Sequence, residues 1–100
     1  MTTSDVEMRT VLESVAQLLD LSEAQVLRTG LRALLQRSLR EVEVEIFRIT
    51  GQYSVTSAEE MEDRYRAGTL DEAESWRDAQ ALDHLEYRRD RLQELLELLP

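Results

Sequence analysis

The chain has 100 residues, of which 42% are hydrophobic and none is cysteine, and its formal net charge is −9. One domain over residues 1–100 with a modest core fits this length, and disulfides and thiolate–metal sites are excluded. The start, MTTSDVEMRT, lacks the basic and apolar regions of a signal peptide, and no apolar run approaches the ~20 residues that cross a bilayer. We therefore expect a cytoplasmic protein that enters no membrane.

The negative charge is concentrated in the second half of the chain. Residues 1–50 have a net charge of −2, whereas residues 51–100 have a net charge of −7. Extended binding to nucleic-acid phosphates depends on cationic side chains, so DNA is not the expected partner. An acidic surface suits a basic protein instead.

Helix boundaries are predicted by capping signals. In a capping box, a Ser or Thr at the N-cap is followed three residues later by Glu or Gln, and a glycine just after a helix ends it in the left-handed conformation. Together these signals predict an all-α fold with helices at 4–19, 22–50, 57–67 and 70–99. The four boxes are Ser4 with Glu7, Ser22 with Gln25, Ser57 with Glu60, and Thr69 with Glu72, and the two glycines are Gly51 and Gly68.

The segment EVEVEIF, residues 41–47, alternates like a strand but lies inside a longer helical pattern. Its apolar residues continue a series with gaps of three and four, which places the whole series on one face of a helix. We therefore predict that the segment is helical, with Val44 and Phe47 lying off that face. The series consists of Ala24, Leu27, Leu31, Leu35, Leu39, Val42, Ile46 and Ile49.

The two long helices exceed the size of a compact domain. At 1.5 Å per residue they would be about 42 and 45 Å long, whereas a compact 100-residue globule is roughly 33 Å across. Their ends must project, and each apolar side chain there contributes about 1.5–3 kcal/mol when it is buried. We therefore predict an elongated bundle that is completed by homodimerisation, with an interface formed by Val44, Phe47, Ile49, Leu92, Leu95, Leu96 and Leu99.

No residue pattern points to catalysis, to a metal or to a cofactor. His84, the only histidine, has no carboxylate three or four residues away on its helix. The serines include no nucleophile elbow, and no glycine-rich loop could cradle a phosphate. We therefore expect a protein that is not an enzyme and that binds no cofactor.

Aromatic and acidic residues of the second half are candidates for binding a partner. Trp76 and Tyr87 could anchor an interface, because aromatic side chains concentrate binding energy, although Trp76 could equally close the core. The acidic candidates share one face of the third predicted helix, and a solvated face would also explain them. They are Glu59, Glu62 and Asp63.

One basic stretch supports an alternative function. Four arginines of the second predicted helix follow one another without an intervening acid. They could contact DNA phosphates in a weak transcriptional regulator, or they could be solvated or complement an acidic second subunit. A self-assembling structural protein is a third possibility. The four residues are Arg28, Arg32, Arg37 and Arg40.

Two segments resemble known proteins. Residues 11–35, VLESVAQLLDLSEAQVLRTGLRALL, resemble the helical part of ribbon-helix-helix regulators, but SDVEMRT does not match their DNA-reading strand, which argues against DNA binding. Residues 45–92 are similar to small bacterial and archaeal proteins associated with antitoxin genes. That likeness implies an acidic antitoxin that neutralises a basic toxin. The expected function is thus a non-catalytic interaction module of antitoxin type.

Overall fold

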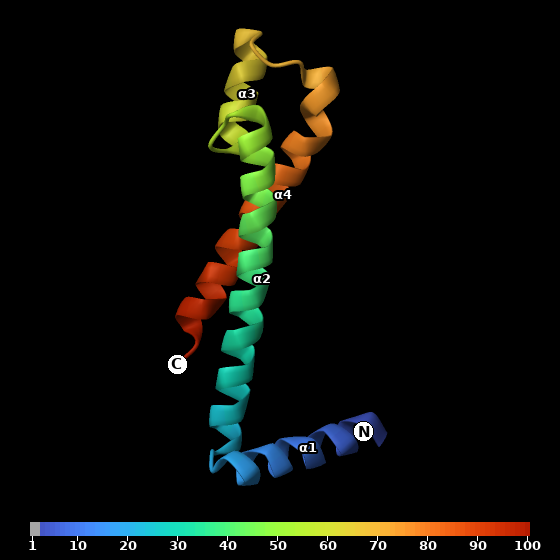
Figure 1. Cartoon of the computed structure of the whole chain (residues 1–100), viewed down its shortest axis with the longest axis vertical. Helices are drawn as coiled ribbons and strands as arrows, with labels where there is room; N and C mark the ends of the chain where they lie inside the picture. The colour runs from blue at the N-terminus through green and yellow to red at the C-terminus, as the bar shows by residue number, and fades with distance from the viewer. Residues whose placement is uncertain (1–2) are drawn as a thin grey trace.

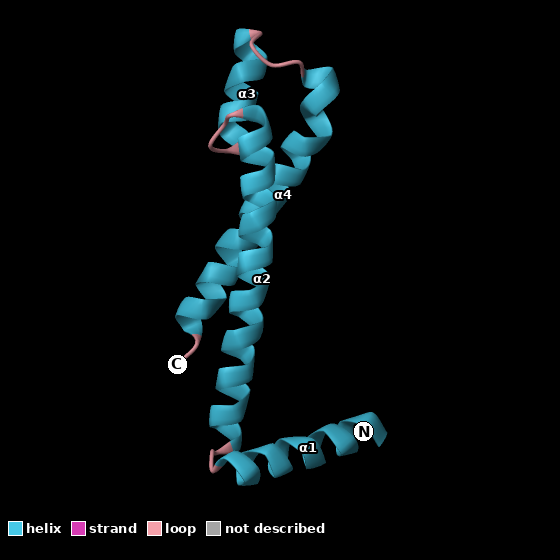
Figure 2. Ribbon diagram, in the orientation of Figure 1, coloured by secondary structure: helices cyan, strands magenta, loops and turns pink. Residues whose placement is uncertain are grey.

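The computed structural model of the protein describes residues 3–100, and every regular element in that range is a helix (Figure 2). The predicted all-α fold is confirmed, and EVEVEIF is helical, as its apolar series indicated. No described helix combines the length and the apolar character that a membrane crossing requires. The helices are α1 (Thr3–Leu19), α2 (Glu23–Tyr53), α3 (Ala58–Ala67) and α4 (Glu72–Leu98).

The helices form an elongated, L-shaped arrangement (Figure 1). α2 is the upright of the L, and α1 leaves its lower end as a foot. α4 runs back down and crosses α2, while α3 lies beside the start of α4 at the upper end. The principal extents are 61 × 27 × 19 Å and the radius of gyration is 20.0 Å, whereas a compact domain of this length has a radius of gyration of about 13 Å.

The hydrophobic core lies at the upper end, where α2, α3 and α4 meet. Ile49 of α2, Met61 of α3 and Leu82 of α4 are fully buried, together with Val55 from the turn between α2 and α3. Each large apolar side chain buried in this way stabilises the fold by about 1.5–3 kcal/mol. The cluster therefore holds α3 and the first half of α4 in a defined relative position.

The apolar series of α2 is covered only along its upper half. Val42 and Ile49 are buried, whereas Leu27 and Leu31 are 53% and 49% exposed. The lower half of the series is exposed because α4 does not extend along it. Nη2 of Arg32 donates to the carbonyl oxygen of Pro100 at 3.2 Å, so the end of α4 lies beside this level of α2. Below that level, the series faces solvent in the described chain.

Several predicted helix caps are confirmed. The backbone N–H of Gln25 donates to Oγ of Ser22 at 3.0 Å, and the N–H of Ser22 donates to Oε1 of Gln25 at 2.8 Å, which completes the capping box of α2. Oγ of Ser57 accepts from the N–H of Glu60 at 3.1 Å at the start of α3. Gly68 ends α3 with a φ of 74°, the left-handed conformation that glycine adopts readily.

Two predicted N-caps are wrong. Ser4 lies inside α1. Thr69 does not begin α4, because its N–H and its hydroxyl both donate to the carbonyl oxygen of Arg64, at 3.0 and 3.3 Å, and so help to end α3. Asp71 caps α4 instead, with its carboxylate accepting from the N–H of Ala73 at 2.9 Å. The N-cap of α4 therefore lies two residues later than predicted, because Thr69 is engaged in ending α3.

The end of α2 also differs from the prediction. Gly51 lies inside the helix, which continues to Tyr53, and Ser54 adopts the left-handed conformation with a φ of 53°. The N–H of Val55 then donates to the carbonyl oxygen of Thr50 at 3.0 Å. A left-handed non-glycine residue costs about 1–2 kcal/mol. Burial of Val55 in the core offsets this cost and determines where the helix ends.

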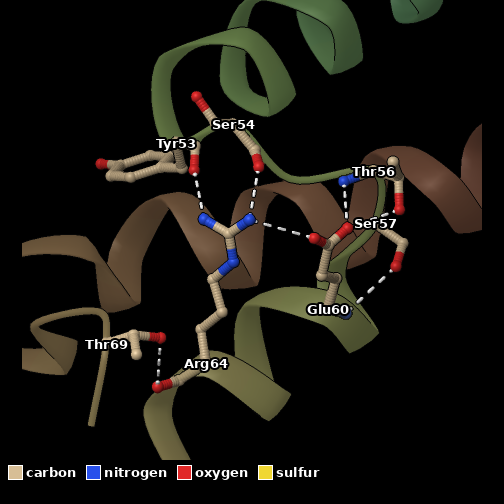
Figure 3. Close-up of polar contacts among 7 residues, drawn as sticks. All are labelled: Tyr53, Ser54, Thr56, Ser57, Glu60, Arg64 and Thr69. Carbon is tan, nitrogen blue, oxygen red and sulfur yellow. Dashed lines mark hydrogen bonds and ion pairs between the residues drawn. The ribbon is translucent and has the colours of Figure 1, made fainter. Parts of the chain in front are cut away.

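Arg64 of α3 holds the turn that follows α2. Its guanidinium donates to the carbonyl oxygens of Tyr53 and Ser54, at 3.1 and 2.7 Å, and pairs with the Glu60 carboxylate at 3.2 Å (Figure 3). Glu60 also accepts from the hydroxyl and the N–H of Thr56, and these bonds lower the pKa of Glu60. The last carbonyl groups of α2, which lack helical partners, are therefore satisfied by α3.

Candidate functional site

An open groove lies between α3 and the first half of α4. Its volume is about 980 Å³, which is at the upper end of the range for small-molecule pockets. The lining combines carboxylates with aromatic and small apolar side chains. The acids are Glu59, Glu62, Glu72, Asp83 and Glu86, and the other lining residues are Tyr65, Trp76, Gln80, Ala58, Ala73 and Ala79.

The α4 wall of the groove is a single stripe of side chains. Glu72, Trp76, Ala79, Asp83 and Glu86 follow one another at gaps of four, three, four and three residues. Because these gaps match the helical period, the five side chains lie on the same side of α4. The three acids of this stripe were not among the predicted site residues, although their spacing around the single Trp was a readable signal.

Polar contacts hold α3 against α4 along the groove. Both carboxylate oxygens of Glu86 accept from the N–H of Ala58, each at 3.4 Å, at the positive end of the α3 dipole. The hydroxyl of Tyr65 lies 2.9 Å from Oγ of Ser75, which is buried and donates to the carbonyl oxygen of Asp71 at 2.7 Å. The two walls are therefore fixed relative to each other, and the groove is preformed.

The lining of the groove is strongly negative. Five of its eleven residues are acids and none is basic. Glu62 forms an ion pair with Arg66 at 3.6 Å, but both side chains are about 70% exposed, and such exposed pairs contribute little. Carboxylates gathered along one depression reinforce one another's field and attract cationic groups.

Trp76 is part of the groove wall and is 43% exposed. Of the two interpretations of Trp76, a position that closes the core does not agree with this exposure, whereas an exposed anchor does. The guanidinium carbon of Arg77 lies 5.7 Å from the centroid of its ring, which is within cation–π distance. An exposed indole beside carboxylates offers a surface for the aliphatic stem and the charged head of a Lys or Arg.

Residues 1–99 match the family model described as the Uncharacterized protein MJ0235 family. The chain belongs to the MJ0235 family. No curated protein and no solved structure matches the chain. Because the match extends from the foot of the L to the end of α4, the acidic groove lies within the segment that defines the MJ0235 family.

In this MJ0235-family fold, only three of the five predicted partner-binding residues lie in the groove. Trp76, Glu59 and Glu62 come together in the groove. Asp63 and Tyr87 do not line it. Asp63 forms an ion pair with Arg66 at 3.2 Å, and Tyr87 is 64% exposed on α4. Residues that share a helix in sequence therefore do not all share the site.

The predicted dimer interface combines buried and exposed side chains. Ile49 is fully buried within one chain, so its assignment to an interface with a second copy is wrong. Val44 and Phe47 are 65% and 78% exposed, and Leu95 is 37% exposed. The remaining α4 leucines are partly covered within the chain; they are Leu92, Leu96 and Leu99.

The four arginines proposed to contact DNA lie on two sides of α2. At about 100° per residue, Arg28 and Arg32 point one way, whereas Arg37 and Arg40 point to another side. Arg32 is bound to the C-terminal carbonyl at 3.2 Å, and Arg37 pairs with an acid one turn along at 3.3 Å. No single face of α2 therefore presents the four charges together, and the geometry does not favour the DNA-binding alternative.

Two observations describe the titratable groups of the described residues. No group of three or more His, Cys, Asp or Glu side chains between residues 3 and 100 is arranged to hold a metal ion. The hydroxyl of Tyr53 donates to the carboxylate of Asp78, and this bond, with burial, raises the pKa of Tyr53 to about 12. The pair joins α2 to α4 and stabilises the protonated phenol.

Proposed function

We propose that this protein is a non-catalytic interaction module that binds a basic segment of a partner protein in the acidic groove. The observation that carries the proposal is the gathering of five carboxylates around an exposed Trp in one preformed depression. Complementary charge speeds encounter and selects partners of the opposite sign. Aromatic side chains at the centre of a patch supply much of the binding energy.

The shape of the groove suits a helical or extended segment better than a small molecule. The depression is open and runs between two helices, as grooves that accept an amphipathic helix do. Its alanines and Trp76 would contact apolar side chains of the segment, while Glu59 and Glu72 on opposite walls would contact its cations. A partner segment should therefore alternate Lys or Arg with apolar residues at helical spacing.

A basic toxin is one class of partner that this site would suit. The likeness of residues 45–92 to antitoxin-associated proteins motivates this proposal, and the net charge of −7 in the second half agrees with it. This proposal predicts that a small basic toxin is encoded beside this gene. Co-expression of the toxin with this protein should abolish the toxicity. Neutralisation should weaken when Glu59 and Glu62 are replaced by Gln.

The groove can be tested directly with its own fluorophore, because Trp76 is the only tryptophan. The probe is a Trp-free amphipathic peptide of Lys and Leu, and a Glu and Leu peptide of the same length is the reference. The Lys peptide should shift the emission of Trp76, and the reference peptide should not. Binding should weaken as salt is added, because the attraction is between exposed charges.

Matched variants separate the groove from general charge attraction. Glu59→Gln with Glu62→Gln should weaken binding of the Lys peptide by about 3- to 10-fold, because two exposed charge contacts are lost. Glu43→Gln with Glu97→Gln removes the same charge from exposed sites outside the groove and should leave the affinity nearly unchanged. Equal weakening in both double variants would show that the groove is not the binding site.

A further inference from the structure

An uncovered apolar surface lies at the other end of the molecule. Nine of the fifteen exposed large hydrophobic side chains among the described residues fall between positions 6 and 34. We call residues 3–34 the foot region; it comprises α1, the following turn and the first part of α2. Ala16 is the only buried residue of α1. α1 packs on α2 alone and extends away from it (Figure 1).

Six of the nine exposed large apolar side chains of the foot region form two stripes, one on each helix. On α1 they recur at gaps of three and seven residues, and on α2 at gaps of four and three. Both patterns place the members of a stripe on the same side of their helix. The stripes consist of Met8, Val11 and Leu18 on α1, and of Leu27, Leu31 and Leu34 on α2, with exposed fractions between 49% and 84%.

The exposed area of the chain exceeds what a monomer of its mass needs. Its accessible surface is 7577 Å², whereas a folded monomeric protein of 11.6 kDa has about 5,800 Å². The excess of about 1,700 Å² is roughly twice the 800 Å² that each partner buries in a standard interface. The chain therefore has enough surplus surface for one full-sized interface at the foot region as well as a groove at the upper end.

The two helices of the foot region have opposite charges. α1 has three acids and one arginine, a net charge of −2, whereas residues 23–34 of α2 have two arginines and one acid, a net charge of +1. A basic partner would be repelled by this part of α2. A second copy of the chain offers an apolar, acidic α1 to each basic α2 segment, so the complementarity is reciprocal.

We infer that two copies dimerise through their foot regions, with α1 of each copy lying along the first half of α2 of the other. α1 is about 26 Å long at 1.5 Å per residue, which is enough to cover the α2 stripe. The two L shapes would interlock about a two-fold axis and bury both stripes in a four-helix core. The acidic grooves lie at the opposite ends of the L (Figure 1) and stay free.

The experiment is sedimentation equilibrium of the full chain. The native protein should have twice the monomer mass of 11.6 kDa. Leu31→Glu with Leu34→Glu should raise the dimer dissociation constant by about 100-fold or more, because each change is made twice in a symmetric apolar interface. Val11→Glu with Leu18→Glu should have the same effect, because the inference requires both helices.

The control variant is Phe47→Glu with Leu98→Glu, which changes two side chains that are equally exposed but lie outside the foot region. It should remain dimeric. A native chain that sediments as a monomer, a dimer that survives the α1 variant, or a dimer that only the control dissociates would each overturn the inference. Circular dichroism checks that the variants remain helical, and the corresponding Gln pairs replace any variant that does not.

This test is independent of the groove. None of the substituted residues lines it, so loss of the dimer should leave binding of the Lys peptide unchanged, and failure of peptide binding leaves the dimer measurement intact.

Discussion

Arg64 shows how a single side chain positions a functional site. No sequence motif singled out this arginine as a site or core residue. In the fold it donates to two carbonyl oxygens at the end of α2 and to Glu60 on its own helix. Because the turn it holds leads directly into α3, one wall of the acidic groove depends on this residue.

Replacing Arg64 should therefore destabilise the protein. Arg64→Met leaves two carbonyl groups without their charged donor and should lower the free energy of unfolding by about 1–2 kcal/mol. Arg66→Met is the matched control, because Arg66 makes only exposed ion pairs and should change stability by less than about 0.5 kcal/mol. Urea denaturation measures both, and equal effects would contradict the role assigned to Arg64.

Tyr53 should titrate above the ordinary range of a tyrosine side chain. Its folded pKa of about 12 lies above the ordinary value of 10.0, chiefly because its hydroxyl donates a hydrogen bond to the Asp78 carboxylate. A raised folded pKa means that the stabilisation is fully present below pH 10 and is lost as the pH rises through 12. Ultraviolet titration of tyrosinate should show one late step that Tyr53→Phe abolishes. A late step that persists in the variant would contradict this assignment.

At the scale of elements, α2 shows that cap signals compete. Ser22 begins the helix as its capping box predicts, because the box is a local device that needs only its own residues. Gly51 does not end it, because two further helical residues and a left-handed Ser54 allow Val55 to enter the core. Where a local preference of about 1 kcal/mol opposes burial of a side chain, burial prevails.

The two kinds of glycine should therefore respond oppositely to alanine. Gly51 is helical and an added Cβ would meet nothing within 4 Å, so Gly51→Ala should raise the free energy of unfolding by about 0.5–1 kcal/mol. Gly68 has a φ of +74°, so Gly68→Ala should lower it by about 1 kcal/mol. Thermal denaturation of the two variants tests whether the free energy of unfolding rises in one and falls in the other. A destabilising Gly51→Ala would show that α2 does not continue through this position.

At the scale of the whole molecule, stability is concentrated at one end. The buried cluster joins α2, α3 and α4 at the top of the L, whereas α1 buries Ala16 alone. Local stability follows the density of buried apolar contacts. The acidic groove is thus built on the rigid end, and the foot region has little intramolecular support.

Hydrogen exchange should reveal this asymmetry. At concentrations where the chain is monomeric, the amides of α1 should exchange fastest, and those around Ile49 and Leu82 should exchange slowest. At concentrations where the foot regions are paired, protection should rise in α1 and in the first half of α2 only. Uniform protection at low concentration would contradict the placement of the core.

The sequence by itself determined the all-α class, the number of helices and most of their boundaries. These depend on the 3.6-residue period and on caps such as Ser22 and Ser57, which act over a few residues. It also indicated that the long helices would outreach a compact domain, because length follows from residue count. Because α3 and α4 were predicted correctly, the sequence also indicated three of the groove residues: Glu59, Glu62 and Trp76.

Only the tertiary structure decided which side chains meet. The packing of α3 on α4 brought Glu72, Asp83 and Glu86 to the same groove as Trp76, and it left Tyr87 outside. Because α4 ends beside Arg32, Leu27 and Leu31 of α2 stay uncovered, whereas Ile49 is buried where α2, α3 and α4 meet. Periodicity assigns a residue to a face of its own helix, but the partner of that face depends on how the helices are joined and where each one ends.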